Sequence, residues 1–187
     1  MDALEKGTKL KIFTYPAPIL KKIAEPVMQF NEELEELCHN MLHTMYHAPG
    51  IGLAAPQVGI GQRIFVMDID YDREEITRAD GETEYTYENF NPRIIINPKF
   101  EKKEGEILYE EGCLSVPGVY EQVKRAEKLT LHYQNIKGEN HSLDAEGLLS
   151  VCLQHENDHL DGIVFIERLS MIKKNLLMKK FLKTKKK

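Results

Sequence analysis

Apolar residues recur at helical spacing in an early segment of the chain. They stand at i, i+3, i+4, i+7 and onward, which is the pattern of one buried helical face. Asn31 can cap this helix, and Pro49-Gly50 is expected to end it. The apolar positions are Leu34, Leu37, Cys38, Met41, Leu42, Met45 and Tyr46.

Two further helices are predicted towards the end of the chain. One is expected from about Ala145 to Leu160, with Asp144 as its N-cap and Gly162 just past its end. The other covers roughly Ser170 to Lys183. Along one side of this last helix lie Ile172, Leu176, Leu177, Phe181 and Leu182.

Short β-branched segments bounded by turn residues predict strands at Arg63–Asp68 and Arg93–Ile96. Alternation predicts a half-buried strand at Leu129–Tyr133, and Ile163–Ile166 is expected to be extended. The polar, acidic segment Tyr71–Asn91 is interpreted as a surface loop or a solvated hairpin without chemistry of its own. Because helices and strands are segregated rather than alternating, the α+β class is favoured.

The composition excludes several classes of protein. The 187 residues are expected to form a single domain, 1–187, with a core at about 10–170 and a basic helix and tail at 170–187. No apolar run reaches the ~18–20 residues of a membrane span, so no membrane contact is expected. Three cysteines are too few for a disulfide scaffold. Without a readable secretory signal, a reducing cytoplasm is the expected location.

The net charge of −5 is unevenly distributed. Eight lysines and no acidic residue lie between Ser170 and Lys187, so the rest of the chain holds 17 basic and 30 acidic side chains. An acidic body argues against broad nucleic-acid binding, and no DNA partner is expected. The lysine-rich end, residues 170–187, remains a candidate for a local contact with RNA.

The strongest chemical signal is the sequence His155-Glu156-Asn157-Asp158-His159. Four helical residues return to within about 40° of the starting direction, so both imidazoles share one helical face. A divalent metal can bind both, while Glu156 flanks the ion as a base that does not ligate it. Two surface histidines would give the same spacing, so a third ligand is needed to support a metal site.

The spacing leaves the third ligand open. Cys113 lies between Gly112 and Pro117-Gly118, where an irregular backbone can bring a thiolate to the helix, and Asp161 and Glu167 are the alternatives. Cys152 is about 10.5 Å along the helix from His159, too far for both to bind one ion, so it is expected to be a wall of the site.

A glycine-rich stretch, Gly50–Gly59, is the third unusual feature. Gly50 and Gly52 let the backbone approach a ligand closely. Gln57 is a neutral donor that can face an oxyanion. The stretch does not match G-x-G-x-x-G after a strand, so a dinucleotide site is disfavoured.

Together these stretches resemble the peptide deformylase family, enzymes that remove the N-formyl group from new bacterial and organellar proteins. The family motifs G-x-G-L-A-A-x-Q, E-G-C-L-S and Q-H-E-x-D-H match Gly50–Gln57, Glu111–Ser115 and Gln154–His159 in order. The similarity covers residues ~10 to ~170. It implies an α+β fold in which antiparallel sheets pack around a central helix carrying the H-E-x-x-H motif, with an N-terminal and a C-terminal helix.

The resemblance also implies a role for each motif residue. Glu156 would be the acid/base, the peptide N–H of Leu114 and the Gln57 side chain would stabilise the oxyanion, and Gly52 would bind the substrate backbone. Arg125 would help to hold the site. The metal ligands would be Cys113, His155 and His159. The pocket for the methionine side chain would be lined by Ile51, Leu148, Val151 and Cys152.

For the reaction, the resemblance implies attack of a metal-bound hydroxide on the formyl carbon, which releases formate. One divalent ion per chain is implied, Fe(II) in the cell, with Zn, Ni or Co able to substitute. The substrates would be N-formyl-methionyl nascent peptides. Because such chains leave a ribosome, whose surface is RNA phosphate, the basic C-terminal helix is a candidate ribosome contact.

Two other functions share part of the pattern. A zincin-type endopeptidase also carries H-E-x-x-H but takes a third His or Glu ligand downstream, so loss of Cys113 would leave its metal in place. A binding protein with a structural metal would have a closed fourth ligand and no positioned glutamate. Such a protein would not act on formyl-Met-Ala-Ser.

Overall fold

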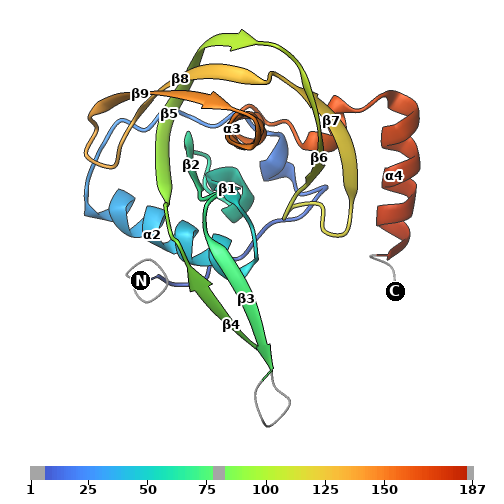
Figure 1. Ribbon diagram of the computed structural model, residues 1–187, viewed down its shortest axis with the longest axis horizontal. Helices are drawn as coiled ribbons and strands as arrows, with labels where there is room; N and C mark the ends of the chain where they lie inside the picture. The colour runs from blue at the N-terminus through green and yellow to red at the C-terminus, as the bar shows by residue number, and fades with distance from the viewer. Residues whose placement is uncertain (1–6, 78–82, 185–187) are drawn as a thin grey trace.

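The computed structural model describes residues 7–77 and 83–184, so the end of the basic tail, 185–187, lies outside it. Figure 1 shows helix α3 seen end-on near the centre, framed by strands, with a hairpin projecting from the body. In chain order the elements are η1 (Pro18–Lys21), α2 (Glu32–His47), β1 (Gly52–Ala54), η2 (Ala55–Val58), β2 (Ile64–Met67), β3 (Asp72–Thr77), β4 (Thr83–Glu88), β5 (Arg93–Glu104), β6 (Ile107–Gly112), β7 (Tyr120–Arg125), β8 (Lys128–Gln134), β9 (Asn140–Glu146), α3 (Leu148–Leu160), η3 (Phe165–Arg168) and α4 (Met171–Thr184).

The main sheet has five antiparallel strands in the order β1-β2-β5-β8-β9. Its register pairs Phe65 with Ile95 and Leu131 with Leu143. Helices α2 and α3 both contact β1 and β2, and α3 also contacts β7 and β9. The predicted α+β class with antiparallel sheets is therefore confirmed, and α3 is held by both the main sheet and the β6–β7 hairpin.

Helix α2 forms as the sequence predicts. The Asn31 side chain accepts a hydrogen bond from the Leu34 N–H at 3.0 Å, and three acidic residues follow in the first turn, where the helix dipole favours them. The helix ends at His47, just before Pro49. All the expected apolar positions are buried except Leu37, which is half-buried and packs against the same core.

The expected start of the second helix is wrong by three residues. Asp144 and Ala145 belong to β9, and the Asp144 carboxylate accepts a hydrogen bond from Thr130 Oγ1 at 2.7 Å instead of capping a helix. Gly147 makes the transition, because its φ of +59° is a conformation that other residues rarely adopt. The expected end is correct, since Gly162 follows Asp161, the C-cap.

Two strand boundaries also differ from expectation. The predicted strand Arg93–Ile96 continues to Glu104, because the ladder with β8 shifts register between Ile96 and Lys99 and so accommodates Pro98. The segment Ile163–Ile166 is not extended throughout, since the 3-10 helix η3 begins at Phe165. The 71–91 segment is a hairpin, β3–β4, whose tip lies outside the described residues.

Helix α4 has the expected length, and its apolar side is buried in part. Phe181 is buried, and Leu177 and Met178 pack with it against the cluster around η3, whereas Ile172 and Leu176 are exposed. The Leu182 side chain lies outside the described part of the chain. Within residues 7–77 and 83–184, no helix is long and apolar enough to cross a membrane.

Candidate active site

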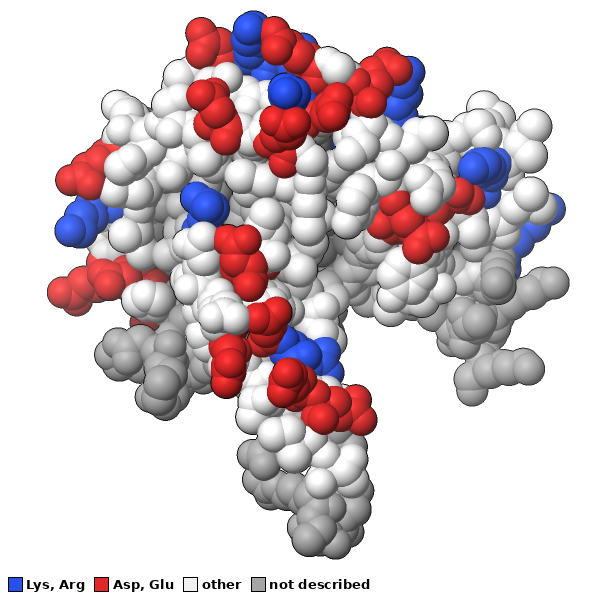
Figure 2. Space-filling view, viewed as in Figure 1, with Lys and Arg blue, Asp and Glu red and all other residues white. Residues whose placement is uncertain are grey.

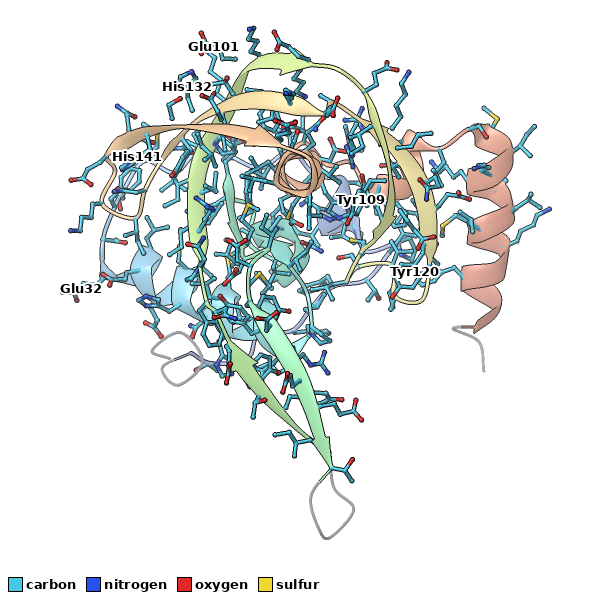
Figure 3. The ribbon with its side chains drawn as sticks, in the orientation of Figure 1. Glu32, Glu101, Tyr109, Tyr120, His132 and His141 are labelled. Carbon is cyan, nitrogen blue, oxygen red and sulfur yellow. The ribbon has the colours of Figure 1, made fainter. Side chains whose placement is uncertain are left out.

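Cys113, His155 and His159 come together at the middle of the molecule. Their ligand atoms lie within 4.8 Å of one another, and Cys113 Sγ is 3.2 Å from His159 Nε2. Helix α3 carries both histidines on one face, and the turn after β6 brings the cysteine to them. Other histidines, such as His132 and His141, project from β8 and β9 at the far edge of the main sheet (Figure 3).

These three residues fit a divalent metal ion. The Glu111 carboxylate accepts a hydrogen bond from His155 Nδ1 at 2.8 Å, which orients the ring with Nε2 towards the cysteine. Burial would lower the pKa of His155, but hydrogen bonds with Cys113 and Glu111 raise it well above its usual value, so this imidazole carries a proton that a bound ion would displace. Burial, together with the positive charges nearby, lowers the pKa of His159 well below its usual value and keeps that imidazole neutral. One thiolate and two imidazoles, both neutral once His155 has released its proton to make room for an ion, form a donor set that suits several transition metals.

A charged network behind the ligands holds them in place. Arg125 donates to both oxygens of Glu111 at 2.7 and 2.9 Å and to Asp158 at 2.6 Å, and all three side chains are almost fully buried. Burial alone would raise the pKa of Glu111, but hydrogen bonds from Arg125 and His155 lower it to about 2. A permanently ionised Glu111 therefore fixes the orientation of His155.

Sequence reasoning assigned no role to Glu111 or Asp158, although both stand inside the matched motifs. A carboxylate that is itself buried must be paired. That rule, applied to Glu111 two positions before Cys113, was the available signal. The buried partner Arg125 lies where the resemblance expects a residue that supports the site.

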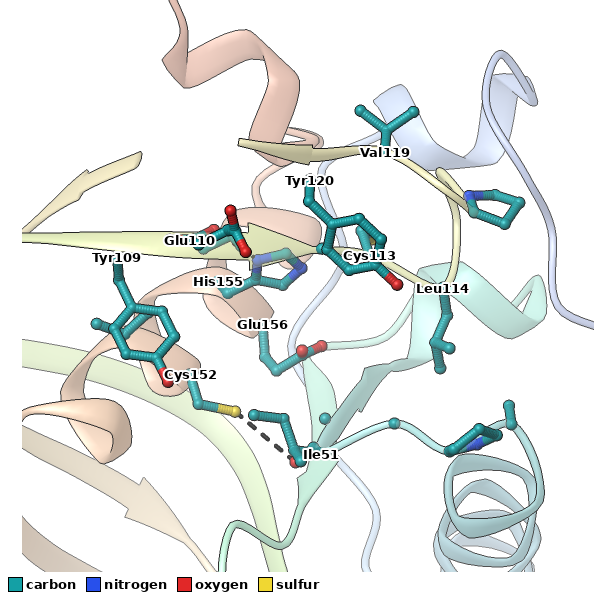
Figure 4. Close-up of a pocket in the computed structure, with 18 of the residues that line it drawn as sticks. Ile51, Tyr109, Glu110, Cys113, Leu114, Val119, Tyr120, Cys152, His155 and Glu156 are labelled. Carbon is teal, nitrogen blue, oxygen red and sulfur yellow. Dashed lines mark hydrogen bonds and ion pairs between the residues drawn. The ribbon is translucent and has the colours of Figure 1, made fainter. Parts of the chain in front are cut away.

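Glu156 faces the pocket next to the three ligands (Figure 4). The side chain is 4% exposed, and within the part of the chain that the structure describes its Oε2 atom has no hydrogen-bond partner. Burial raises the pKa of Glu156 to about 7. A Cβ atom at Gly52 would lie only 2.4 Å from Glu156 Oε1, so any side chain at position 52 would displace the Glu156 carboxylate.

Gln57 lies on the other side of Cys113. Its Oε1 atom accepts from the Ala54 N–H at 2.7 Å, which orients the amide. Its Nε2 group then donates to Cys113 Sγ at 3.6 Å and to Ser115 Oγ at 3.2 Å. The donor end of Gln57 is thus fixed towards the cysteine. Leu114 lines the same pocket.

The pocket has a volume of about 400 Å³. Its wall includes the residues expected to hold a methionine side chain, Ile51, Leu148, Val151 and Cys152. Burial raises the pKa of Cys152 well above its usual value, so its thiol stays protonated; Cys152 Sγ lies 3.7 Å from the Ile51 carbonyl. Tyr109 and Tyr120, which sequence reasoning did not identify, also line the pocket, from β6 and β7 (Figure 4).

The two alternative third ligands are engaged elsewhere. Asp161 Oδ1 pairs with Arg63 at 2.8 Å, and its other oxygen accepts from Asn157 at 2.9 Å. Glu167 pairs with Lys21 and Lys174, and it accepts from the Val164 N–H at 3.1 Å. Within the described ranges, the Cys113 group is the one cluster of this kind.

Comparisons with known proteins agree with this geometry. Residues 9–175 match the family model of polypeptide deformylase. A peptide deformylase of Neisseria meningitidis is 46% identical over 177 residues, covering 95% of this chain and 96% of that protein. A crystal structure of a peptide deformylase from Legionella pneumophila superposes with a TM-score of 0.82 at 40% identity, over 96% of both chains. The chain belongs to the polypeptide deformylase family.

Proposed function

We propose that this chain hydrolyses the N-formyl group of N-terminal methionine in newly made proteins and releases formate. One observation carries the proposal beyond family membership. A buried carboxylate with a free oxygen, Glu156, stands in the same pocket as a Cys-His-His group that fits a metal. That combination is suited to hydrolysis, because it places a base beside a site for an activated water.

Cys113, His155 and His159 would hold one divalent metal ion, and Glu111 and Arg125 would keep the ligands oriented. Such an ion, when bound, acts as a Lewis acid and lowers the pKa of water towards 7. The donor set accepts Fe(II), Zn, Ni or Co. We assign Fe(II) as the metal in the cell on the basis of the family resemblance.

Glu156 would take a proton from the attacking water and pass it to the leaving amine nitrogen. Its pKa of about 7 suits both transfers, because a group can accept and return a proton readily near its own pKa. Negative charge that develops on the formyl oxygen would be stabilised by the Leu114 N–H and by Gln57 Nε2, whose direction is fixed before substrate arrives.

The rest of the pocket would position the substrate. The backbone of Gly52, next to Glu156, would hydrogen-bond the peptide chain. The methionine side chain would enter between Ile51, Leu148, Val151 and Cys152, a mostly apolar surface that suits a flexible thioether.

A direct assay tests the proposed function. Protein purified without oxygen and loaded with Fe(II), Ni(II) or Co(II) should release formate from formyl-Met-Ala-Ser, and acetyl-Met-Ala-Ser is the matched control. A zincin-type peptidase would instead cut within the peptide, and a binding protein would leave it intact. Absence of formate with every metal would refute the proposal.

We also propose a cytoplasmic location and a contact between the basic end and the ribosome. Helix α4 carries Lys173, Lys174 and Lys179 among its described side chains, and Lys173 and Lys174 are paired with Glu121 and Glu167. Opposing charge on RNA would compete for these lysines in a salt-sensitive manner. Neutralising these lysines should weaken co-sedimentation with ribosomes at low salt and leave the rate on a tripeptide unchanged. Wild-type protein that never co-sediments would contradict this contact.

A further inference from the structure

The base of the β3–β4 hairpin is tied to the core by a single buried carboxylate. Asp68 is 1% exposed and accepts hydrogen bonds from Tyr46 Oη at 2.7 Å and from the backbone N–H groups of Asp70, Tyr71 and Asn91. Four donors on one carboxylate fix both ends of the hairpin against helix α2. The hairpin that projects in Figure 1 is therefore anchored at its root.

Tyr71 joins this root to the wall of the active-site pocket. Its hydroxyl donates to the Gly50 carbonyl at 3.1 Å, and its ring packs edge-on against Tyr46 at 5.0 Å. Gly50 is a pocket residue and lies two positions before Gly52. The first residues of β3 are thus held in a fixed position relative to the place where substrate would bind.

The two faces of the hairpin differ in charge. Strand alternation and the pairing of Arg73 with Tyr87 and of Glu75 with Tyr85 put these four residues on one face. The opposite face carries most of the hairpin's described acidic side chains: Asp72, Glu74 and Glu88. Figure 2 shows acidic groups along the projecting hairpin, with basic atoms near its root.

The Arg73 face borders a hollow that continues from the active-site pocket. The hollow is lined by Pro49, Ile51, Tyr71, Arg73, Glu75 and Tyr85, and it shares Pro49 and Ile51 with the pocket. A peptide whose methionine sits beside Ile51 can therefore pass over this residue and reach β3. Ile51 is 41% exposed, as expected of a surface that a ligand would cover.

Arg73 is held ready to bind an acceptor. Its guanidinium lies 3.7 Å from the centre of the Tyr85 ring, which fixes its plane. Its Nε atom is buried and has no hydrogen-bond partner among the described residues. Glu75 shares this face but lies one pair further from the pocket and is exposed, so water screens its charge.

We propose that Arg73 is a specificity-determining residue that binds an acidic side chain of the substrate a few residues beyond the formyl-methionine. The proposal rests on the proposed function and adds a substrate preference to it. A carboxylate in the hollow pairs with the guanidinium of Arg73, and it does so best in a bidentate arrangement because the plane of that group is already fixed.

A peptide series tests this preference. The substrates are formyl-Met hexapeptides with C-terminal amides, which carry Asp, Asn or Lys at one of the second to fifth residues and Ala or Ser elsewhere. At low salt, the Asp peptide should have a kcat/KM about two- to fivefold above its Asn partner at one or two adjacent positions, mainly through KM. High salt should abolish the difference.

Variants of the hairpin identify the residue responsible. Arg73→Gln should remove the Asp preference, and Arg73→Glu should invert it in favour of Lys. Glu74→Gln, on the opposite face of the same strand, is the matched control and should keep the preference. All variants should hydrolyse formyl-Met-Ala-Ser-amide as wild type does, because that peptide has no carboxylate for Arg73.

The outcomes separate this proposal from the proposed function. If wild type releases no formate from the tripeptide amide, the proposed function fails. If it does so but shows no Asp preference at any position, or if Arg73→Gln keeps the preference, the role of Arg73 is wrong. A preference for Lys in wild type would likewise overturn it and assign the contact to Glu75.

Discussion

At the residue scale, the role proposed for Glu156 separates metal binding from catalysis. Glu156→Ala should keep about one metal per chain and lose about 10²–10⁴-fold in kcat/KM, because a general acid/base contributes that much while Cys113, His155 and His159 remain. Metal analysis and formate release measure both quantities on the same sample. An apo protein would show that Glu156 is needed for metal binding.

The cysteine ligand can be tested against the acidic alternatives. Cys113→Ser should lose the metal or bind it far more weakly, because a serine hydroxyl is much less acidic than a thiol. Asp161→Asn is the matched control, since Asp161 is paired with Arg63, and it should retain the metal. The reverse result would favour the zincin interpretation.

How far the sequence predicts the site differs from residue to residue. The i, i+4 spacing puts His155 and His159 on one face of a helix and Glu156 beside them, because helix geometry is local. The third ligand could not be chosen by spacing, because Cys113 comes from a different element and its approach depends on the path of β6. The pairing of Glu111 with His155 and Arg125 is equally non-local, and only the fold shows it.

At the element scale, the N-cap of helix α2 can be tested directly. Asn31→Ala should lower the free energy of unfolding by about 1 kcal/mol, because the Leu34 N–H loses its acceptor. Asn31→Asp keeps an acceptor and should be close to neutral. Urea unfolding measures both variants, and equal losses would show that the cap bond is not the cause.

Elements whose signals are local were predicted, and elements that depend on contacts between distant segments were not. Helix α2 has its cap, its apolar face and its stop within one segment, so local signals suffice. Asp144 has the chemistry of a cap, yet pairing of β9 with β8 places it in a strand opposite Thr130. In α4 the apolar positions can be recognised locally, but which of them is buried depends on contact with η3, so the sequence does not show that Phe181 is buried while Ile172 and Leu176 are exposed.

At the scale of the whole molecule, stability should fall in alkaline solution because buried acidic groups are held neutral. Burial raises the pKa of Cys38 to about 12, and burial and the neighbouring Asp68 raise that of Tyr46. Burial also raises the pKa of Tyr71, against a lowering by Arg73. In an unfolded chain these groups ionise at about pH 8.5 for cysteine and about pH 10 for tyrosine.

Because these pKa values are raised in the folded state, stability falls as the pH rises. Below the unfolded pKa both states are protonated and the stabilisation is complete; above it, the unfolded state releases protons that the folded state keeps. Each group then lowers the free energy of unfolding by up to about 1.4 kcal/mol per pH unit until its folded pKa is reached.

Tyr46→Phe removes one such group, so the free energy of unfolding of this variant should fall less steeply than that of wild type above about pH 10. Asp68 keeps three backbone donors in this variant, which limits the loss at neutral pH. Urea unfolding over a pH series gives the slope of the free energy of unfolding against pH for wild type and for the variant. Tyrosinate absorbance reports tyrosine ionisation cleanly because the chain has no Trp. Parallel slopes for the two proteins would contradict a neutral, buried Tyr46.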